Sequence, residues 1–300
     1  MSEISFQDRV AIITGAGGGL GKTYALEFAR RGASVVVNDL GGSADGTGAS
    51  KAADEVVKEI SEAGGKAVAN YDSVATPEGG AAIVQTAVDN FGKVDVVINN
   101  AGILRDKTFA KLAPADLEIV LDVHLKGAFF VSQPAFAIMK EQGYGRFVFT
   151  ASGAGIFGNF GQSNYGAAKM GLVGLSNVLS VEGAKYNIKC NTIAPIARTR
   201  LTESLLGPMA DNLHPECVTP LVTYLASEAC ETTHDIFDVG GGRYARIFIG
   251  MAPGKAYGKG ARPSAEQIQA DFAEILNPEG YTIPLSIGDE MKATLEAFKD

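Results

Sequence analysis

The sequence predicts an α/β protein in which strands and helices alternate to build a parallel sheet. Residues 9–14 are rich in β-branched residues, as is typical of a short strand, and residues 22–31 take up helical periodicity after a glycine-rich turn. The same order of strand, turn and helix recurs along the chain, which favours a parallel sheet with helices packed against it. The chain has 300 residues, enough for one large domain or two small ones, and its 46% of hydrophobic residues is ample for a core.

The expected elements follow one another in a regular order as far as residue 98. Thr76 is spaced as the N-cap of a helix, and Pro77 occupies its first helical position. The run at 94–98 is typical of a short buried strand and is followed by asparagines. The elements expected before it are a strand over 33–38, a helix over 52–64, a strand over 66–72 and a helix from Thr76 to Asn90.

Composition and charge argue against several classes of partner. The net charge of -8 and the pI near 5.0 disfavour nucleic acid and anionic membrane surfaces, and favour small molecules. The three cysteines are widely spaced, which suits a reducing compartment, and the three histidines have no metal-ligand spacing, so we expect no metal. The N-terminus lacks an apolar signal segment and no run of roughly 18 apolar residues occurs, so we expect a cytoplasmic protein without a membrane span.

The glycine-rich turn is predicted to bind the phosphates of a dinucleotide. Gly15, Gly19 and Gly21 are spaced G-x-x-x-G-x-G at the start of a helix, where the backbone can approach a pyrophosphate held by the first N–H groups. Asp39 ends the next strand, 18 residues after Gly21, near the distance expected for an acidic residue that binds the adenosine ribose. No cation lies among residues 16–19 to receive a 2′-phosphate, so we expect NAD rather than NADP. The alternative is that Asp39 only caps a turn.

Three further segments follow strand ends and are candidates for cofactor contacts. Asp72 could accept a hydrogen bond from the adenine amino group. Asn100, Ala101 and Gly102 would let the nicotinamide half of a dinucleotide lie close to the backbone, and the alternative is an asparagine-rich turn. The long glycine-rich loop from Gly41 to Ser50 is either a flexible cover beside the ribose or a solvated connection.

Ser152, Tyr165 and Lys169 are candidates for an acid/base site. Tyr165 and Lys169 are four residues apart at the expected start of a helix, so the phenol and the ammonium would lie on one face. A phenol has an ordinary pKa of about 10, and we expect the nearby ammonium to lower it. Ser152 follows a strand-like run and could orient an alcohol or polarise a carbonyl. The alternative is a Tyr/Lys pair on a solvated helix face and a serine that serves a turn.

These motifs together resemble one known family. Thr14 to Gly21 matches T-G-x-x-x-G-x-G, residues 99–102 match N-N-A-G, and the serine, tyrosine and lysine match S-x12-Y-x3-K, in that order. In this combination the chain resembles the short-chain dehydrogenase/reductase family over about residues 6–242.

The resemblance implies a fold, a reaction and a set of binding residues. The fold is a Rossmann-type, doubly wound, seven-stranded parallel sheet with helices on both faces, in one catalytic domain over residues 1–242. The reaction is reversible NAD(P)-dependent oxidation of an alcohol: Tyr165 takes the hydroxyl proton, Ser152 holds the substrate oxygen, and Lys169 lowers the tyrosine pKa and binds the nicotinamide ribose. Homo-oligomers, either dimers or tetramers, are expected from the family. The implied cofactor-binding residues are Gly15, Gly19, Leu20, Gly21, Asp39, Asp72, Asn100, Ala101, Gly102, Tyr165, Lys169 and Thr199.

Two positions depart from the family pattern. The family places an asparagine on the preceding helix, where it links the lysine to a chain of water molecules, and His124 stands there in this chain. An imidazole can both donate and accept, so His124 is a candidate catalytic residue; the alternative is a buried histidine bound to a backbone carbonyl. Ile196 stands where the family usually has glycine, and Thr199, one position off the usual spacing, is the candidate for binding the nicotinamide carboxamide.

The chain continues for 58 residues beyond the glycines at 240–242, near which most short members of the family end. Residues 243–262 carry five basic residues and no acidic one. They could hold an anionic substrate handle such as the phosphates of coenzyme A, or form a solvated loop. Ser264 and Gln267 are spaced as a capping box at the start of a helix, and a last helix-like segment closes the chain. We expect this extension, residues 243–300, to pack on the catalytic domain.

Four features narrow the resemblance to one branch of the family. They are the loop after N-D-L at 38–40, the G-N-F-G-Q-x-N-Y run at 158–165, His124 and the extended tail. They resemble the (3R)-hydroxyacyl-CoA dehydrogenase units of type 2 multifunctional β-oxidation enzymes, also called 17β-hydroxysteroid dehydrogenase type 4, and their bacterial relatives. This resemblance implies NAD-dependent oxidation of a (3R)-3-hydroxyacyl-CoA, and some relatives accept steroid side-chain CoA esters.

Two other functions stay open at this point. A hydroxysteroid dehydrogenase would use the same three residues on a free steroid alcohol. A non-catalytic NAD-binding sensor would keep the cofactor site without turnover, although the intact serine, tyrosine and lysine argue against it. Residues 200–215 are apolar enough to roof a hydrophobic pocket, but they do not identify a substrate.

Overall fold

The computed structural model describes residues 3–199, 202 and 207–296. The chain divides into two compact units, Met1–Arg246 and Ile247–Asp300. None of the described helices is long and apolar enough to cross a membrane. Part of the segment 200–215, which was expected to roof a pocket, and the last residues of the expected C-terminal helix lie outside the described residues.

The first unit is built on a mostly parallel sheet, which has eight strands among the described residues. The strand order is β3-β2-β1-β4-β5-β6-β7-β8, so the chain winds outward from β1 in one direction and from β4 in the other. The described strand pairs from β3 to β7 are all parallel. The strands are β1 (Val10–Thr14), β2 (Ser34–Asn38), β3 (Lys66–Asn70), β4 (Val96–Asn99), β5 (Gly145–Thr150), β6 (Ile188–Pro195), β7 (Ile236–Gly240) and β8 (Arg243–Ile247).

The expectation of seven strands was wrong by one strand. The additional strand, β8, follows β7 through Gly241 and Gly242, which have φ values of 55° and 82°. Two successive residues with positive φ form the tight turn that best matches the twist of a β-hairpin, and glycine adopts this conformation without strain. From the sequence these residues were expected only to begin a basic tail, so the strand was missed.

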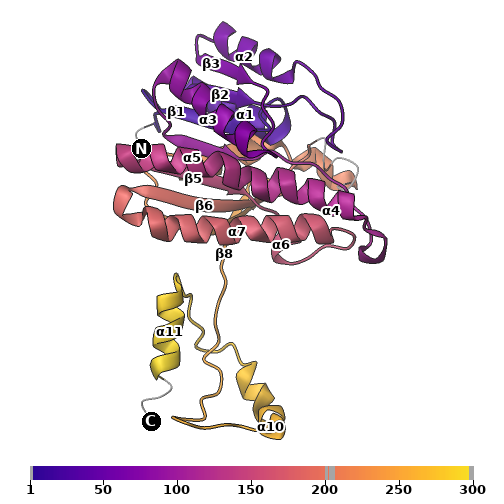
Figure 1. Cartoon of the computed structure of the whole chain (residues 1–300), viewed down its shortest axis with the longest axis vertical. Coiled ribbons are helices and arrows are strands. Elements are labelled where there is room, and N and C mark those ends of the chain that lie inside the picture. Colours follow the sequence, from indigo (N-terminus) through magenta and orange to yellow (C-terminus); the bar gives the residue numbers. More distant parts are fainter. Residues whose placement is uncertain (1–2, 200–201, 203–206, 297–300) are drawn as a thin grey trace. The chain divides into compact units, whose positions relative to one another are not determined.

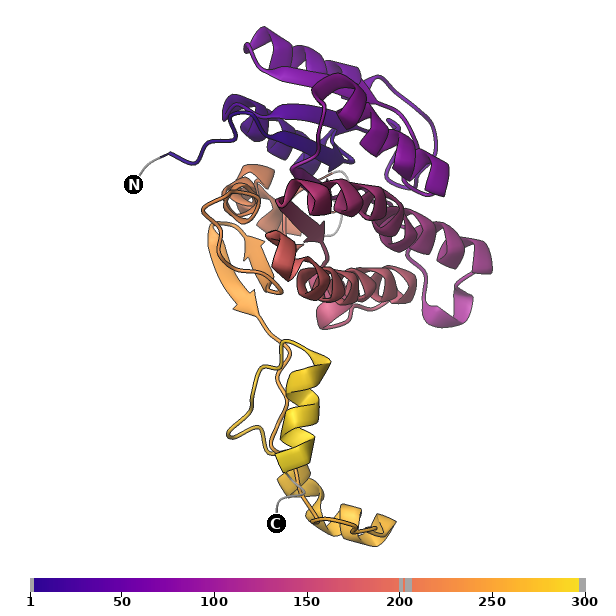
Figure 2. The ribbon, with the colours of Figure 1, turned by 60° about the vertical axis from the view of Figure 1, so that its left-hand side comes forward.

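Helices cover both faces of the sheet, as Figures 1 and 2 show. Helices α1, α2 and α9 contribute to the hydrophobic cluster on one face, and α3, α5 and α7 contribute to the cluster on the other. The strands alternate accordingly: Ala11 and Ile13 of β1 belong to the first cluster, and Val10 and Ile12 belong to the second. The helices are α1 (Gly19–Arg30), α2 (Ala52–Glu62), α3 (Pro77–Phe91), α4 (Pro114–Leu121), α5 (Gly127–Gln142), α6 (Gly153–Ile156), α7 (Ser163–Gly183) and α9 (Thr219–Leu225), with short 3₁₀ segments η1 (Phe109–Lys111), η3 (Ala184–Tyr186), η4 (Gly207–Asn212) and η5 (Pro215–Cys217) and a π segment η2 (Asp122–Lys126).

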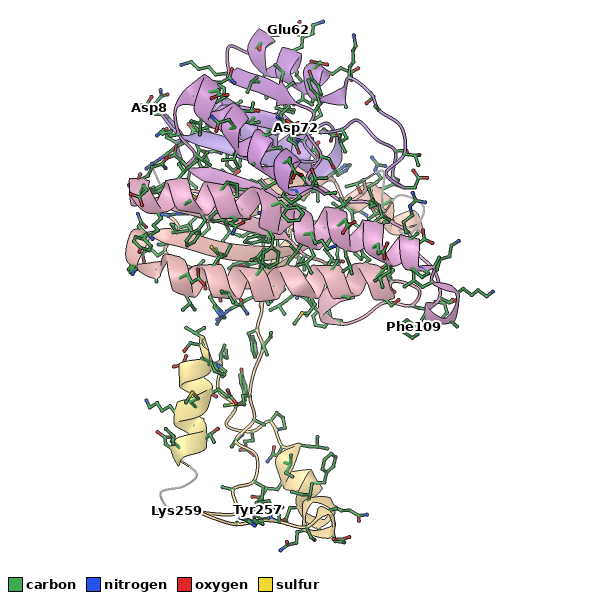
Figure 3. The ribbon with its side chains drawn as sticks, viewed as in Figure 1. Asp8, Glu62, Asp72, Phe109, Tyr257 and Lys259 are labelled. Carbon is green, nitrogen blue, oxygen red and sulfur yellow. The ribbon has the colours of Figure 1, made fainter. Side chains whose placement is uncertain are left out.

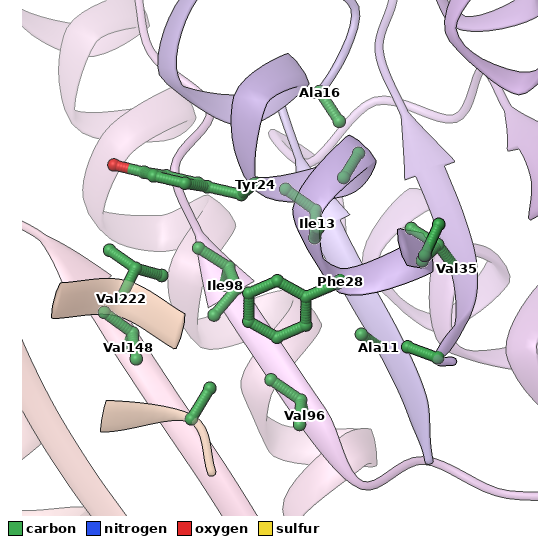
Figure 4. Close-up of a cluster of buried hydrophobic side chains, with 14 of the residues drawn as sticks. Ala11, Ile13, Ala16, Tyr24, Phe28, Val35, Val96, Ile98, Val148 and Val222 are labelled. Carbon is green, nitrogen blue, oxygen red and sulfur yellow. The ribbon is translucent and has the colours of Figure 1, made fainter. Parts of the chain in front are cut away.

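The core of the first cluster combines aliphatic strand residues with the aromatic rings of Phe6, Tyr24 and Phe28, of which the last two belong to α1. Phe28 is fully buried and lies beside Ile13, Val96 and Ile98 in Figure 4. Burying a phenylalanine of this size contributes roughly 1.5–3 kcal/mol. This packing fixes α1 against β1 and β4, and therefore fixes the glycine-rich turn at the carboxyl edge of the sheet.

The capping signals in the sequence are confirmed. The Thr76 side chain accepts a hydrogen bond from Gly79 N at 3.1 Å, and Pro77 is the first residue of α3. In the second unit, Ser264 and Gln267 form a complete capping box at the start of α10 (Ala265–Ile275). That unit also contains α11 (Ile287–Glu296), and none of the described residues of either helix is buried.

Candidate active site

The glycine-rich turn after β1 has the backbone geometry that a phosphate site needs. Gly15 and Gly19 have φ values of 65° and 51°, a conformation that favours glycine. A methyl group on Gly21 would lie 2.2 Å from the Gly15 carbonyl oxygen, so the first turn of α1 approaches the loop as closely as glycine allows. Gly18 is the N-cap of α1, has no capping side chain and has open space where a Cβ would stand. The helix therefore begins with N–H groups that can bind an anion.

Thr199 lies beside this turn. A methyl group on Gly19 would lie 3.4 Å from Thr199 Cγ2. The Thr199 backbone N–H donates to Thr202 Oγ1 at 2.9 Å, which holds the residue in place after β6. The structure thus brings Thr199 together with the glycine-rich turn, and its binding to a nicotinamide carboxamide stays a prediction.

Asp39 is positioned by two backbone N–H groups from different turns. Gly17 N donates to its Oδ2 at 2.8 Å, and Gly41 N donates to its Oδ1 at 2.6 Å. The turn-capping role considered for Asp39 is therefore present. It does not exclude ribose binding, because each carboxylate oxygen can accept a second hydrogen bond. Asp72 is held by a side chain instead, since Asn70 Nδ2 donates to its Oδ2 at 2.7 Å.

Asn100 ties the segment after β4 to the glycine-rich turn. Its Nδ2 donates to the carbonyl oxygens of Thr14 at 3.0 Å and Gly15 at 3.1 Å. The N–H groups of Asn100 and Ala101 both donate to Thr14 Oγ1, at 3.0 and 3.1 Å. A methyl group on Gly15 would lie 2.8 Å from Ala101 Cα. The N-N-A-G motif therefore fixes the shape of the cofactor edge, a role that the sequence analysis did not assign to it.

Ser152 and Tyr165 converge at the carboxyl end of β5. Ser152 is the N-cap of α6 and accepts a hydrogen bond from Ala154 N at 3.2 Å. Tyr165 is the third residue of α7, as the sequence predicted. Burial raises the pKa of the Tyr165 phenol, a hydrogen bond with Ser152 opposes this rise, and the nearby charge of Asp106 adds to it.

Lys169 is buried one helical turn after Tyr165, and burial of the phenol, not the Lys169 charge, sets the direction of the Tyr165 pKa shift. Its ammonium donates to the Thr150 carbonyl oxygen at 2.5 Å and lies 5.5 Å from the centre of the Tyr165 ring. Burial lowers the pKa of Lys169 from 10.5 to about 7. The expected lowering of the tyrosine pKa is therefore replaced by a rise, because desolvation of the phenol dominates in the structure.

His124 lies in the π segment η2, next to Tyr165 and within the electrostatic influence of Lys169. Its ring is 3% exposed and meets the Tyr165 ring edge-on, with ring centres 5.2 Å apart. Nε2 lies 3.0 Å from Ile103 N and 2.8 Å from Ile103 O, and which of the two it bonds depends on the tautomer. Burial lowers the pKa of His124 well below its usual value, and the Lys169 charge adds to this, so the imidazole is neutral at pH 7.

The second ring nitrogen of His124, Nδ1, is buried and makes no hydrogen bond to any described residue. The ring also lines a cavity of about 10 Å³, together with Thr14 and Asn99. This volume is enough for one water molecule. A neutral imidazole beside such a cavity can hold a water molecule, which is compatible with the link to water considered from the sequence. The alternative considered from the sequence was a buried histidine bound to a backbone carbonyl. This describes Nε2, which lies 2.8 Å from Ile103 O.

The G-N-F-G-Q-x-N-Y run at 158–165 contains two side chains whose roles were not predicted from the sequence. Asn164 is buried, and its Nδ2 donates to the carbonyl oxygens of Arg105 at 3.0 Å and Asp116 at 3.1 Å. Gln162 Nε2 donates to Asp106 Oδ2 at 2.7 Å. These two amides connect the start of α7 to the segment after β4 and to the first turn of α4. The sequence feature that could have pointed to these two side chains is their position, one and three residues before Tyr165.

Three basic residues in the described part of the extension form ion pairs, and each of them pairs with an acidic residue of its own unit. Arg243 pairs with Asp238. Arg246 pairs with Asp235 at 2.7 Å. In the second unit, Lys255 pairs with Glu274 at 2.9 Å. These contacts favour the structural alternative that was considered for this stretch.

The fold and the site agree with one family. A family model described as short chain dehydrogenase matches residues 9–206, and the chain belongs to this family. It is 53% identical over 279 residues to a short-chain type dehydrogenase/reductase of Mycobacterium tuberculosis, covering 92% of this chain and 97% of that protein. It is 36% identical over 249 residues to a hydroxyacyl-CoA dehydrogenase of the same organism, covering 78% of this chain and 77% of that protein.

Two larger proteins contain a similar unit. The chain is 47% identical over 300 residues to peroxisomal multifunctional enzyme type 2 of Mus musculus, covering 99% of this chain and 40% of that enzyme. The solved structure of full-length peroxisomal multifunctional enzyme type 2 from Drosophila melanogaster matches with a TM-score of 0.83 and 37% identity, over 99% of this chain and 50% of that one. The chain thus spans half or less of these two enzymes.

Proposed function

We propose that this chain is an NAD-dependent dehydrogenase that oxidises (3R)-3-hydroxyacyl-CoA thioesters to 3-ketoacyl-CoA thioesters. The observation that carries the proposal is the convergence of Ser152 and Tyr165, with the buried Lys169 one helical turn away, in a member of the short-chain dehydrogenase family. The thioester substrate is supported by the hydroxyacyl-CoA dehydrogenase among the relatives and by the similarity to the multifunctional enzymes.

Each residue of the site has a separate role in the oxidation of the substrate hydroxyl. Ser152 donates a hydrogen bond to the substrate oxygen, and Tyr165 as phenolate accepts its proton. The O–H electron pair forms the new C=O bond while the hydrogen on C3 leaves as hydride. Lys169, when protonated, stabilises the phenolate, and its lowered pKa lets it exchange a proton near neutral pH. His124 positions the Tyr165 ring by the edge-on contact.

The carboxyl edge of the sheet fits NAD, which when bound supplies the hydride acceptor. The glycine-rich turn and the uncapped start of α1 suit a pyrophosphate. Asp39 has acceptor capacity left for ribose hydroxyls, and its charge disfavours the 2′-phosphate of NADP. A homo-oligomeric assembly and a cytoplasmic location stay our expectations for the protein.

The proposal is tested by NAD reduction with matched (3R)- and (3S)-3-hydroxyacyl-CoA thioesters of medium chain length and with a free steroid alcohol. Turnover of the (3R) thioester alone supports it. Preference for the steroid alcohol would instead establish the hydroxysteroid dehydrogenase alternative with the same residues. Binding of NAD without turnover of any of these alcohols would establish the sensor alternative.

A further inference from the structure

The segment between β4 and η1 is fixed to the loop that leads into the catalytic helix. Lys107 N donates to the Gly161 carbonyl oxygen at 2.9 Å, and Lys107 forms a parallel β-bridge with Gln162. The amides of Gln162 and Asn164 bind Asp106 and Arg105 in the same segment. Because Tyr165 directly follows Asn164, the segment is held beside the catalytic residue by contacts at three successive positions.

This segment and the loop it contacts present an unusual surface to solvent. Phe109 is 82% exposed and Phe160 is 88% exposed, and Lys107 and Lys111 are exposed on either side of Phe109 in the sequence. Figure 3 shows Phe109 at the edge of the first unit, on the short η1 segment. Neither lysine forms an ion pair with any described residue. We call these four residues the rim patch.

The composition of the rim patch indicates an anionic aromatic ligand. Phe160 and Phe109 are the two most exposed large hydrophobic side chains among the described residues, and an apolar surface that is flanked by charged residues is typical of a binding site. Two cations left without carboxylate partners, in a chain with a net charge of -8, form a local site for anions. Phosphate groups pair with lysine, and a purine ring stacks on an exposed aromatic side chain.

We propose that the rim patch binds the adenosine bisphosphate end of the acyl-CoA substrate, with Lys107 and Lys111 on its phosphates and Phe109 or Phe160 against its adenine. The inference rests on the proposed function, whose substrate carries this nucleotide at the far end of a flexible pantetheine arm. The arm would lead from the thioester at Tyr165 past Gln162, three residues earlier, to Lys107, which is bridged to Gln162. The patch thus replaces the basic residues of the C-terminal extension as the phosphate-binding site.

The test compares a (3R)-3-hydroxyacyl-CoA with the pantetheine thioester of the same acyl group, which lacks the nucleotide and its phosphates. The variants are Lys107→Glu/Lys111→Glu and Phe109→Ala. Lys66→Glu is the matched control, because Lys66 is also exposed but begins β3 at the opposite, amino edge of the sheet. The double variant should raise KM for the CoA thioester by about tenfold, since loss of two charged contacts is worth at least that factor. Its kcat should not change, and its KM for the pantetheine thioester should stay at the wild-type value.

The outcomes distinguish the rim-patch proposal from the proposed function. An equal KM for the CoA thioester in the double variant and the wild type would overturn the rim patch, and so would an equal rise for both thioesters. A change in molecular mass by light scattering in the Phe109→Ala variant, with both KM values unchanged, would show that the patch is a contact between copies of the chain. Failure of the wild type on both thioesters would overturn the proposed function, and calorimetric binding of free CoA to the wild type and the double variant would then decide on the patch alone.

Discussion

Gly102 and His124 fit against each other so closely that a methyl group on Gly102 would lie 2.3 Å from His124 Cε1. His124 Nε2 bonds either the N–H or the carbonyl oxygen of Ile103, depending on the tautomer, and the ring packs edge-on against Tyr165. The last glycine of the N-N-A-G motif is therefore the space into which the imidazole fits. This contact joins the cofactor edge of the sheet to the catalytic tyrosine.

Replacing Gly102 by alanine should displace His124 and disturb both sides of this contact. We expect Gly102→Ala to destabilise the protein by about 1–3 kcal/mol, the usual cost of overpacking a tight site. It should also lower kcat, because the Tyr165 ring loses its edge-on support. Urea unfolding and steady-state kinetics measure the two effects.

A second substitution shows whether the histidine is the cause. Combining Gly102→Ala with His124→Ala should recover part of the lost stability, because the methyl group then has room. Gly174→Ala is the control: Gly174 lies inside α7 with no neighbouring atom within 4 Å of its Cβ position, so alanine should be neutral or stabilising there. A full penalty for Gly102→Ala in the absence of the imidazole would contradict the contact.

The buried ammonium of Lys169 is predicted to lower the stability of the folded protein. Its folded-state pKa of about 7 is below the usual 10.5, so between these values the unfolded chain binds more protons than the folded one. The cost of burying Lys169 is therefore greatest below pH 7 and declines as the pH rises toward 10.5. Lys169→Met should raise the free energy of unfolding by about 1–4 kcal/mol at pH 6 and abolish turnover.

The pH dependence distinguishes this effect from ordinary repacking. The stability difference between Lys169→Met and the wild type should narrow steadily from pH 7 to pH 10 in thermal unfolding. Lys189 is a useful comparison, because it also donates to a carbonyl oxygen, that of Cys230 at 2.7 Å, but is only partly buried. Lys189→Met should not stabilise the protein. If the difference in stability between Lys169→Met and the wild type does not vary with pH, burial does not lower the pKa of Lys169.

The phenol of Tyr165 is predicted to titrate above its ordinary range in the cofactor-free protein. Burial is the largest influence on its pKa and raises it. The difference in tyrosinate absorbance between the wild type and Tyr165→Phe should therefore have a midpoint above about 10. A midpoint below that value would restore the sequence-based expectation that Lys169 lowers the pKa.

Asp39 should decide between the two dinucleotides. Asp39→Asn removes the negative charge while keeping one acceptor for Gly17 N or Gly41 N. We expect the ratio of kcat/KM for NAD to that for NADP to fall by about 10–100-fold, because a like-charge repulsion of a few kcal/mol is removed and a ribose acceptor is lost. Measuring both cofactors with one alcohol substrate gives the ratio. An unchanged ratio would leave Asp39 with its turn-capping role alone.

Local patterns in the sequence were enough to predict the positions of most elements. Strand and helix periodicity located β1, α1, β2 and α3, and the capping residues Thr76 and Ser264 marked two helix starts correctly. The spacing of Tyr165 and Lys169 placed them on one helix at its first turns. These predictions succeeded because each depends on residues close together in the chain.

The missed features depend on contacts between distant residues. Asn164 binds the carbonyl oxygens of Arg105 and Asp116, 59 and 48 residues away, and no local pattern announces such partners. The direction of the Tyr165 pKa shift depends on burial by several elements, which the spacing to Lys169 does not reveal. The strand β8 was missed because a short alternating run with arginines was attributed to a basic tail.

The most direct test of the account is the turnover of (3R)-3-hydroxyacyl-CoA by the Tyr165→Phe variant, together with its affinity for NADH. Tyr224→Phe, on the partly exposed α9, is the control for loss of a phenol elsewhere. We predict that Tyr165→Phe lowers kcat by about a thousandfold, as expected for loss of a general acid/base, while the Kd for NADH stays at the wild-type value. Wild-type turnover in this variant would contradict the assignment of Tyr165 as the residue that moves the hydroxyl proton.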